Sequence, residues 1–197
     1  MEFDDVWRRR RMRRSFTGEP LDLDRLEHLV EESLRAPTAG NCGGVRATIL
    51  GPRLVSTFIL AATDEGWRAH SRRREGLERA GAVVIYSSRP EDYAARYREA
   101  DKARSDLGDL ANWPVPYWHT DAAMAALGCV LLCENEGWGA ALWGAFRHHA
   151  DIATLAGLGD EDIFASLFIG VPDFRDPPSR SLSRPTPSRA ERVRRRE

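Results

Sequence analysis

The chain has 197 residues, of which 42% are hydrophobic and 30% are charged, a composition typical of a globular protein with one core. The formal net charge is −1 and the isoelectric point about 6.5, so the strong basic excess of dedicated nucleic-acid binders is absent. The N-terminus has no apolar secretory segment, and the longest apolar stretch, Ala122–Cys133, is too short to cross a bilayer. We therefore expect a cytoplasmic protein that binds neither membranes nor nucleic acid.

A run of arginines marks the start of the chain. Six of the seven residues from Arg8 to Arg14 are arginine, and Met12 is the exception. Guanidinium groups bind phosphate through paired, charge-assisted hydrogen bonds, so the run indicates an anionic partner; a terminus that simply faces solvent is the alternative. We expect a short helix over Asp4–Arg14, with Arg10 and Arg14 on one face converging on a single phosphate.

The first half of the chain predicts helices and strands in alternation. Apolar residues recur at helical spacing in two segments, and the first of these helices begins with Asp22 or Asp24 as its N-cap. Two apolar runs predict strands, the second buried on both faces, and a segment rich in glycine predicts a loop. The expected elements are helix Leu21–Arg35, loop Ala36–Gly44, strand Val45–Leu50, helix Pro52–Asp64 and strand Ala82–Tyr86.

The second half continues this alternation with one very apolar helix. Residues His119–Glu136 are apolar on every side, so we expect a central helix that also lies close to a partner subunit. The tail from Asp173 has no hydrophobic period and is expected to be disordered or laid over a neighbour. The other expected elements are a polar helix Glu91–Arg104, a strand or loop Gly137–Gly144, a helix Ala150–Leu158 and a strand Ile163–Val171.

The cysteines and histidines indicate no metal centre. Cys42, Cys129 and Cys133 lack paired metal-ligand spacing, and the latter two are expected to be buried thiols within the apolar helix. No side chain stands out as a catalytic acid or base. At the start of that helix, Asp121 is expected to be a cap.

Four motifs occur in a fixed order along the chain. They are Arg10-Arg11-Met12-x-Arg14-x-Phe16, Ala36-Pro37-Thr38-Ala39-Gly40-Asn41, Gly137-Trp138-Gly139-Ala140 with Leu142-Trp143-Gly144, and Pro177-Pro178-Ser179-Arg180 with Arg184. In this order and spacing the chain resembles the FMN-dependent nitroreductase family from about Val6 to about Arg184.

That resemblance implies an α+β fold, a three-layer sandwich with a central, mostly antiparallel sheet flanked by helices. It implies an intertwined homodimer with FMN sites at the interface, one domain over residues 1–184 and an Arg- and Pro-rich tail over 185–197. The implied activity is ping-pong hydride transfer from NADH or NADPH, through the flavin, to a nitroaromatic, a quinone or another small organic acceptor.

The resemblance also assigns cofactor-binding residues. Phosphate and the ribityl chain would lie against Arg10, Arg11, Met12 and Arg14, completed by Arg180 and Arg184. The loop residues Pro37, Thr38, Ala39 and Asn41 would lie along the flavin ring, largely from the second subunit. Backbone amides of Leu142, Trp143 and Gly144 would approach the reactive ring nitrogen.

One departure from the family pattern leaves alternatives open. Family members commonly follow the Asn with x-Gln-Pro-Trp, whereas here Asn41 is followed by Cys42-Gly43-Gly44-Val45. A flavin-dependent oxidase or dehydrogenase of a biosynthetic intermediate is one alternative. The other is a non-catalytic, Arg-rich protein that binds nucleic acid or an acidic partner.

Overall fold

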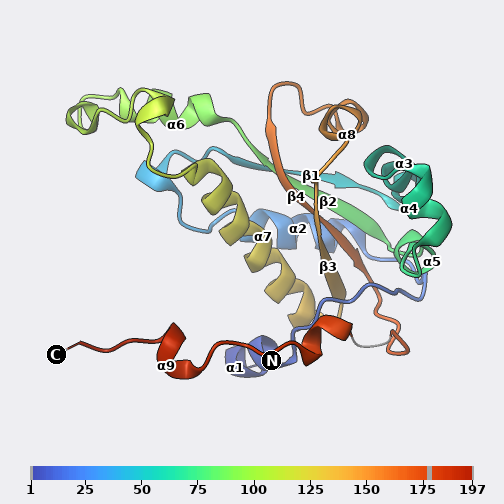
Figure 1. Cartoon of the computed structure of the whole chain (residues 1–197). Coiled ribbons are helices and arrows are strands. Elements are labelled where there is room, and N and C mark those ends of the chain that lie inside the picture. The colour runs from blue at the N-terminus through green and yellow to red at the C-terminus, as the bar shows by residue number, and fades with distance from the viewer. Residues whose placement is uncertain (1, 177–178, 197) are drawn as a thin grey trace.

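The computed structural model describes residues 2–176 and 179–196, apart from the side chains of residues 180, 189 and 190 (Figure 1). Its centre is a four-stranded sheet with the order β1-β2-β4-β3, in which every neighbouring pair is antiparallel. The strands are β1 (Val45–Leu50), β2 (Ala82–Ser88), β3 (Gly139–Gly144) and β4 (Asp162–Gly170). β1 and β3 are therefore the two edges of the sheet.

Helices cover both faces of the sheet because successive strand residues point to opposite sides. On one face, Val83 and Ile85 of β2 pack against α3 (Pro52–Ala62) and α8 (His149–Ala156). On the other, Val84 and Tyr86 pack with α2 (Leu23–Ser33) and α7 (Tyr117–Asn135). The predicted α+β three-layer sandwich is confirmed.

Several predicted boundaries are close to those observed. β1 has the predicted bounds, and α2 begins at the predicted N-cap, where Asp22 accepts the N–H of Arg25 at 3.0 Å. The polar helix is shorter than predicted: α6 (Pro90–Tyr97) ends before a turn-rich segment. It is not purely a solvated helix either, because Tyr93 is fully buried.

Short elements make up the rest of the described structure. They are α1 (Phe3–Arg9), η1 (Ala39–Asn41), α4 (Glu65–His70), α5 (Arg74–Glu78), η2 (Ala103–Ser105), η3 (Leu110–Asn112), η4 (Arg180–Ser183) and α9 (Arg189–Arg192). None exceeds two helical turns, which is too short for a hydrophobic period to appear in the sequence.

The long helix α7 has one buried face and one open face. Cys129 and Cys133 lie on the buried face, their sulfurs 4.0 Å apart, which confirms the prediction of buried thiols. On the open face, Tyr117, Met124 and Leu127 are 40–41% exposed. One chain therefore buries only part of this helix, and the expected partner subunit at its open face stays a prediction. No described helix is both long and apolar enough to span a membrane.

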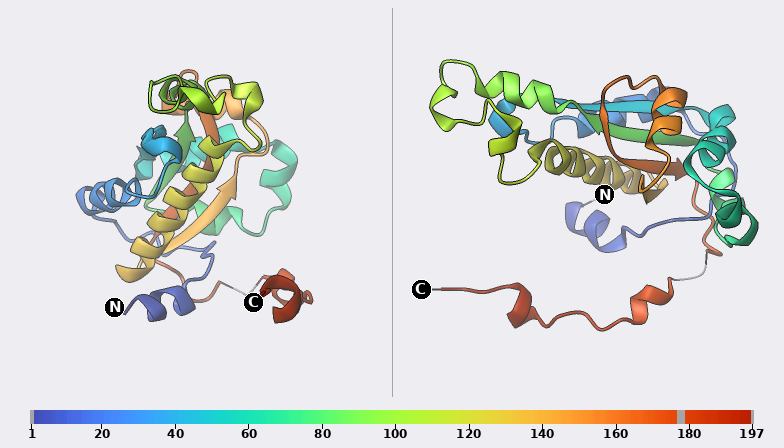
Figure 2. Two further views of the ribbon diagram at one scale, coloured as in Figure 1. Left: turned by 90° about the vertical axis from the view of Figure 1, so that its left-hand side faces the viewer. Right: turned by 45° about the horizontal axis from the view of Figure 1, so that its top comes forward.

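The C-terminal segment stands apart from the sheet and its helices. Figure 2 shows the C-terminal segment running alongside the molecule, separate from the sheet and its covering helices. Its apolar side chains Leu182 and Val193 are 73% and 64% exposed. This segment adds little to the core of one chain.

Candidate functional site

The arginine segment is extended where a helix was predicted. Helix α1 ends at Arg9, and Met12 then forms a parallel bridge with Ala140 of β3. The N–H of Arg13 donates to the carbonyl of Ala140 at 3.0 Å, and the N–H of Leu142 donates to Met12 Sδ at 3.4 Å. The helix stops because pairing with the open edge of β3 satisfies these backbone groups. The prediction that Arg10 and Arg14 share a helix face is therefore wrong.

Two of the predicted phosphate-binding arginines nevertheless face a common cavity with their charges free. Arg10, Arg11, Met12 and Arg14 line a cavity of about 440 Å³, together with Ser179 and Ser181 from the C-terminal segment. Within the described residues, the guanidinium groups of Arg10 and Arg14 have no ion-pair partner. A free guanidinium is what an anion requires.

The remaining arginines of this set differ in what they contact. Arg11 donates to the carbonyls of Arg8 and Arg10 at 2.7 and 2.9 Å and so closes the end of α1. Arg8 is exposed and pairs with Asp4 at 3.3 Å. Arg184 is exposed directly after η4, while the side chain of Arg180 lies outside the described part of the chain.

The outer edge of β3 continues beyond the arginine segment. An antiparallel strand directs its N–H groups alternately toward its partner strand and away from it. Because the N–H of Leu142 points away, to Met12, the N–H of Gly144 points to the same outer edge. Of the three predicted amide donors, Leu142 is thus occupied by Met12 and Trp143 points toward β4, which leaves the N–H of Gly144 on the outer edge.

Aromatic side chains wall the space beside this edge. Trp143 meets Trp67 of α4 edge to face, with ring centroids 5.1 Å apart. The two rings, with Leu142, Gly144 and Phe146, line a cavity of about 660 Å³. Trp67 was missed from the sequence because α4 has only six residues; the Asp64 N-cap, which accepts the N–H of Trp67 at 2.7 Å, was its one local signal.

A smaller cavity joins the aromatic wall to the arginine segment. Its volume is about 250 Å³, and its lining includes Arg14, Trp67, Ser71, Arg73 and Trp143. The predicted phosphate-binding and amide segments are therefore brought together along one edge of the sheet.

The predicted ring-contacting loop lies elsewhere and is held by buried polar groups. The N–H of Ala39 donates to Asp121 Oδ2 at 2.7 Å, and Arg96 Nε donates to the carbonyl of Gly40 at 2.9 Å. Thr38 accepts the N–H of Gly43 at 3.2 Å. The loop turns at Gly40 and Asn41, which have φ of 62° and 54°, values that glycine and asparagine tolerate best.

Asp121 anchors the loop and is not the cap of α7. The N-cap is Pro116, and Asp121 lies within the helix at 2% exposure. It also accepts a hydrogen bond from the hydroxyl of Tyr93 at 3.0 Å. Burial, with added contributions from Cys42 and Asp121, holds the pKa of Tyr93 above its ordinary value. The hydroxyl therefore stays protonated and donates.

Gly44 of the unusual Gly43-Gly44 pair leaves room for the aromatic ring of Tyr93. A Cβ placed on Gly44 would lie 2.6 Å from Tyr93 Cε2, whereas one on Gly43 would meet nothing within 4 Å. The buried ring thus fills the space that a side chain at position 44 would need. This packing accounts for the departure at Gly44.

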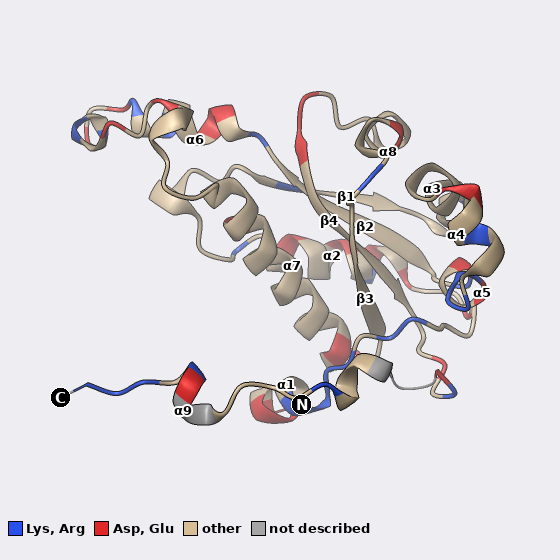
Figure 3. Cartoon of the chain, viewed as in Figure 1, with Lys and Arg blue, Asp and Glu red and all other residues tan. Residues whose placement is uncertain are grey.

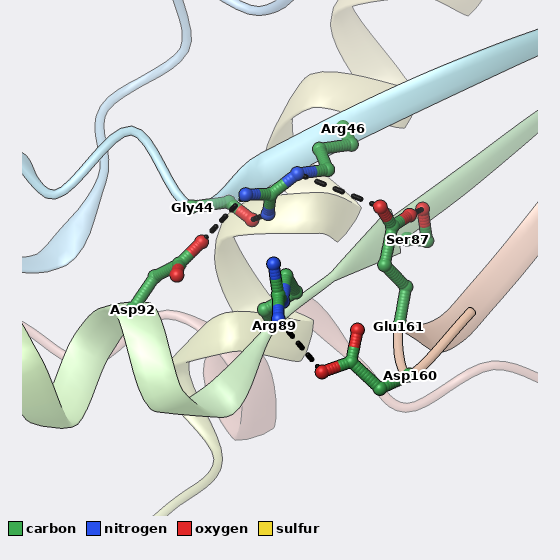
Figure 4. A network of polar contacts seen from close by, with 7 residues as sticks. All are labelled: Gly44, Arg46, Ser87, Arg89, Asp92, Asp160 and Glu161. Carbon is green, nitrogen blue, oxygen red and sulfur yellow. Dashed lines mark hydrogen bonds and ion pairs between the residues drawn. The ribbon is translucent and has the colours of Figure 1, made fainter. Parts of the chain in front are cut away.

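A polar network fixes the downstream end of the loop (Figure 4). Arg46 donates to the carbonyl of Gly44 at 3.1 Å and pairs with Asp92 at 2.7 Å and Glu161 at 3.5 Å. Ser87 donates to Glu161 at 2.5 Å. The network ties the loop to α6 and to the start of β4.

The two halves of the predicted site are far apart within one chain. The loop contacts α7 at Asp121, near its first turn, whereas Met12 pairs with β3 just after the helix ends. About 20 Å of helix lies between Asp121 and Asn135, at 1.5 Å per residue. One chain therefore does not bring the loop to the arginines. No group of metal-binding side chains occurs among the described residues.

Solved structures of nitroreductase-family proteins have a similar fold. Among solved structures, a nitroreductase-family protein from Clostridium novyi NT has a TM-score of 0.68 and 21% identity over 88% of this chain and 87% of its own. The nitroreductase CinD from Lactococcus lactis has a TM-score of 0.77 and 14% identity over all of both chains. The family protein from Streptococcus pneumoniae TIGR4 has a TM-score of 0.75 and 15% identity over 99% and 100%.

No curated protein matches the chain by sequence. The family model described as "Nitroreductase family" matches residues 7–171, which include the arginine segment, the loop and the β3 edge. The chain belongs to the nitroreductase family.

Proposed function

We propose that this protein is an FMN-dependent NAD(P)H oxidoreductase, working as a homodimer on a nitroaromatic, a quinone or another small organic acceptor. Membership of the nitroreductase family supports an oxidoreductase function in general. The observation that carries the finer proposal is the edge of β3, where Arg14 shares one cavity with Arg10 and a second with Leu142 and Trp143.

The residues along this edge fit the phosphate and one side of the ring of a flavin mononucleotide. Arg10 and Arg14 supply charges for a phosphate dianion without giving up an existing ion pair. Trp67 and Trp143 supply an apolar wall for a planar ring, in a cavity of about 660 Å³ that lies in the range typical of ligand sites. When bound, the flavin would supply the hydride and electron chemistry, and the protein would position it.

The chain's own residues would then bind the flavin, orient its ring and shield the ring from water. Arg10 and Arg14 would fix the phosphate, and the N–H of Gly144 would donate to the edge of the ring. The aromatic rings of Trp67, Trp143 and Phe146 would exclude water from that side. No acid or base on this edge is required for these roles.

A second copy of the chain would complete the site. The Pro37–Asn41 loop lies too far from its own arginines to contact the same ligand, so we assign it to the flavin of the partner subunit. The open face of α7, with Tyr117, Met124 and Leu127 each about 40% exposed, is a surface that such a dimer would cover.

One relative has been solved with small aromatic molecules bound. Structures of the Lactococcus lactis nitroreductase are described in complex with nicotinic acid, chloramphenicol and 4-nitrophenol. The aromatic cavity beside Gly144 suits rings of this kind.

The visible spectrum of the purified protein, before and after added FMN, tests the proposal. We expect bound flavin absorbance that disappears when NADPH or NADH is added without oxygen and returns when 4-nitrophenol or a quinone is supplied. A colourless protein that takes up no FMN and oxidises neither nicotinamide would contradict it. DNA retention that falls with salt, without flavin, would favour the binding-protein alternative.

A further inference from the structure

A second arginine-rich cavity lies on the other side of Arg14. It has a volume of about 510 Å³ and is enclosed by the arginine segment, the turn before α5 and the turn at 173–176. Figure 3 shows the basic residues of the N-terminal segment and of the turn before α5. The charged lining residues are Arg14, Arg72, Arg73, Arg79, Arg175, Glu75, Asp173 and Asp176.

Ion pairs neutralise only part of this charge. Arg73 pairs with Asp176, Arg79 with Glu75, and Arg175 with Asp173. Among the described residues, Arg14 and Arg72 have no such partner. Five arginines against three carboxylates leave the cavity two positive charges in excess.

The walls of the cavity are fixed by backbone contacts. Asp176 accepts the N–H of Arg14 at 3.0 Å, and the N–H of Phe16 donates to the carbonyl of Gly76 at 3.2 Å. A Cβ on Gly76 would lie only 2.7 Å from the carbonyl oxygen of Arg14, so the two segments touch. The arginines thus project from a preformed frame, which lowers the entropy lost when an anion binds.

The cavity adjoins the edge of β3. It shares Arg14 and Arg73 with the 250 Å³ cavity that reaches Trp143. A long ligand that reacts at the β3 edge can therefore extend a second anionic group toward Arg72.

We propose that this cavity binds the 2′-phosphate of NADPH and makes NADPH the preferred electron donor; this rests on the proposed function. NADPH and NADH differ only in that phosphate. A phosphate monoester carries a charge of about −1.5 to −2 at pH 7. Because Arg14 is assigned to the flavin phosphate, the unpaired guanidinium group of Arg72 would supply the charge that binds the 2′-phosphate. Arg72 is the specificity-determining residue because it is free, exposed and absent from the lining of the proposed flavin cavities.

Direct binding tests the proposal without relying on turnover. Adenosine 2′,5′-bisphosphate and adenosine 5′-monophosphate differ by the 2′-phosphate, and calorimetry on the full chain compares them. We expect the bisphosphate to bind about tenfold or more tightly, and Arg72→Ala to abolish that preference. Arg53→Ala is the matched control, since Arg53 is an exposed arginine on α3 outside these cavities.

Steady-state rates and the affinity for FMN provide a second test of the proposal. Arg72→Ala should lower kcat/KM for NADPH about tenfold or more, leave kcat/KM for NADH unchanged, and leave the Kd for FMN unchanged. Equal binding of the two adenosine phosphates to the wild-type chain would overturn the proposal. So would a weaker FMN affinity in Arg72→Ala, which would assign the cavity to the flavin phosphate. Wild-type protein that binds no FMN yet prefers the bisphosphate would instead contradict only the proposed function.

Discussion

The arginine segment and the Pro37–Gly44 loop are built in opposite ways. The arginine segment is held by its backbone along β3, which leaves the side chains of Arg10 and Arg14 free. In the loop, the backbone itself is bound by side chains: the N–H of Ala39 donates to Asp121, and Arg96 donates to the carbonyl of Gly40. These backbone groups therefore already have hydrogen-bond partners within the chain. The first region therefore has unpaired charges at its side chains, and the second has a fixed backbone.

This difference fits the proposal that the two regions serve one site from two subunits. A loop with a fixed backbone can contact a neighbouring molecule without changing its conformation. The free arginines, in contrast, have no anionic partner within the described chain, so a bound anion would supply one. The open face of α7 lies between the two regions and would carry the contact.

The largest expected effect comes from breaking that contact. Leu127→Glu places a charge on the open face of α7, and in an apolar interface an unpaired charge costs about 3 kcal/mol or more. We expect a monomer by sedimentation and a loss of FMN affinity of about 100-fold or more. Leu60→Glu, at an exposed leucine of α3, is the control and should leave the dimer intact. A dimeric Leu127→Glu protein would show that α7 is not the interface.

Asp121 tests how firmly the loop is held. Asp121→Ala would leave the partly buried N–H of Ala39 and the buried hydroxyl of Tyr93 without an acceptor, at a cost of about 2–4 kcal/mol. Urea unfolding measures the loss. Asp24→Ala, at an exposed carboxylate of α2, should change stability by less than about 0.5 kcal/mol. A loss below about 1 kcal/mol for Asp121→Ala would mean that the loop has another support.

Substitution of a free arginine tests the predicted phosphate-binding segment. Arg14→Ala should weaken FMN binding by about 1.5–3 kcal/mol, the range for a charged hydrogen bond. Arg8→Ala should do little, because Arg8 is exposed and pairs only with neighbouring carboxylates of α1. Fluorescence titration of FMN gives both values. Equal losses in the two variants would show that the phosphate is not bound at the predicted positions.

The smallest effect is a pH dependence of stability. Burial raises the pKa of Tyr86 and of Tyr93 above the ordinary value near 10, so each remains protonated in the fold where the unfolded chain would ionise. Their stabilisation is complete below that value and falls above it by about 1.4 kcal/mol per pH unit for each. Tyr93→Phe should reduce this slope in urea unfolding between pH 10 and 11, and an unchanged slope would contradict the burial argument.

Helices and strands whose sequence pattern lies within a few neighbouring residues could be predicted from the sequence. The apolar run of β1 and the helical spacing of α2 with its Asp22 cap both lie within a few residues, and both were located closely. Helices α4 and α5 are too short to show a period, so Trp67 and the turn carrying Arg72 were missed as wall residues.

Other features depend on contacts between distant residues. Arg10–Arg14 is extended because β3 has an open edge, and Asp121 anchors a loop 82 positions earlier in the chain. Neither partner is visible from local composition. The ordered motifs predicted the site residues, which stay a prediction, whereas the separation of these residues into two regions of the chain required the fold.

Sedimentation velocity of the wild-type protein with FMN, followed by flavin absorbance across a dilution series, tests most directly whether the site is shared. If two chains build each site, bound flavin should sediment with the dimer, at one FMN per chain, and be released as dilution gives monomers. Flavin that sediments with the monomer at full occupancy would contradict a shared site.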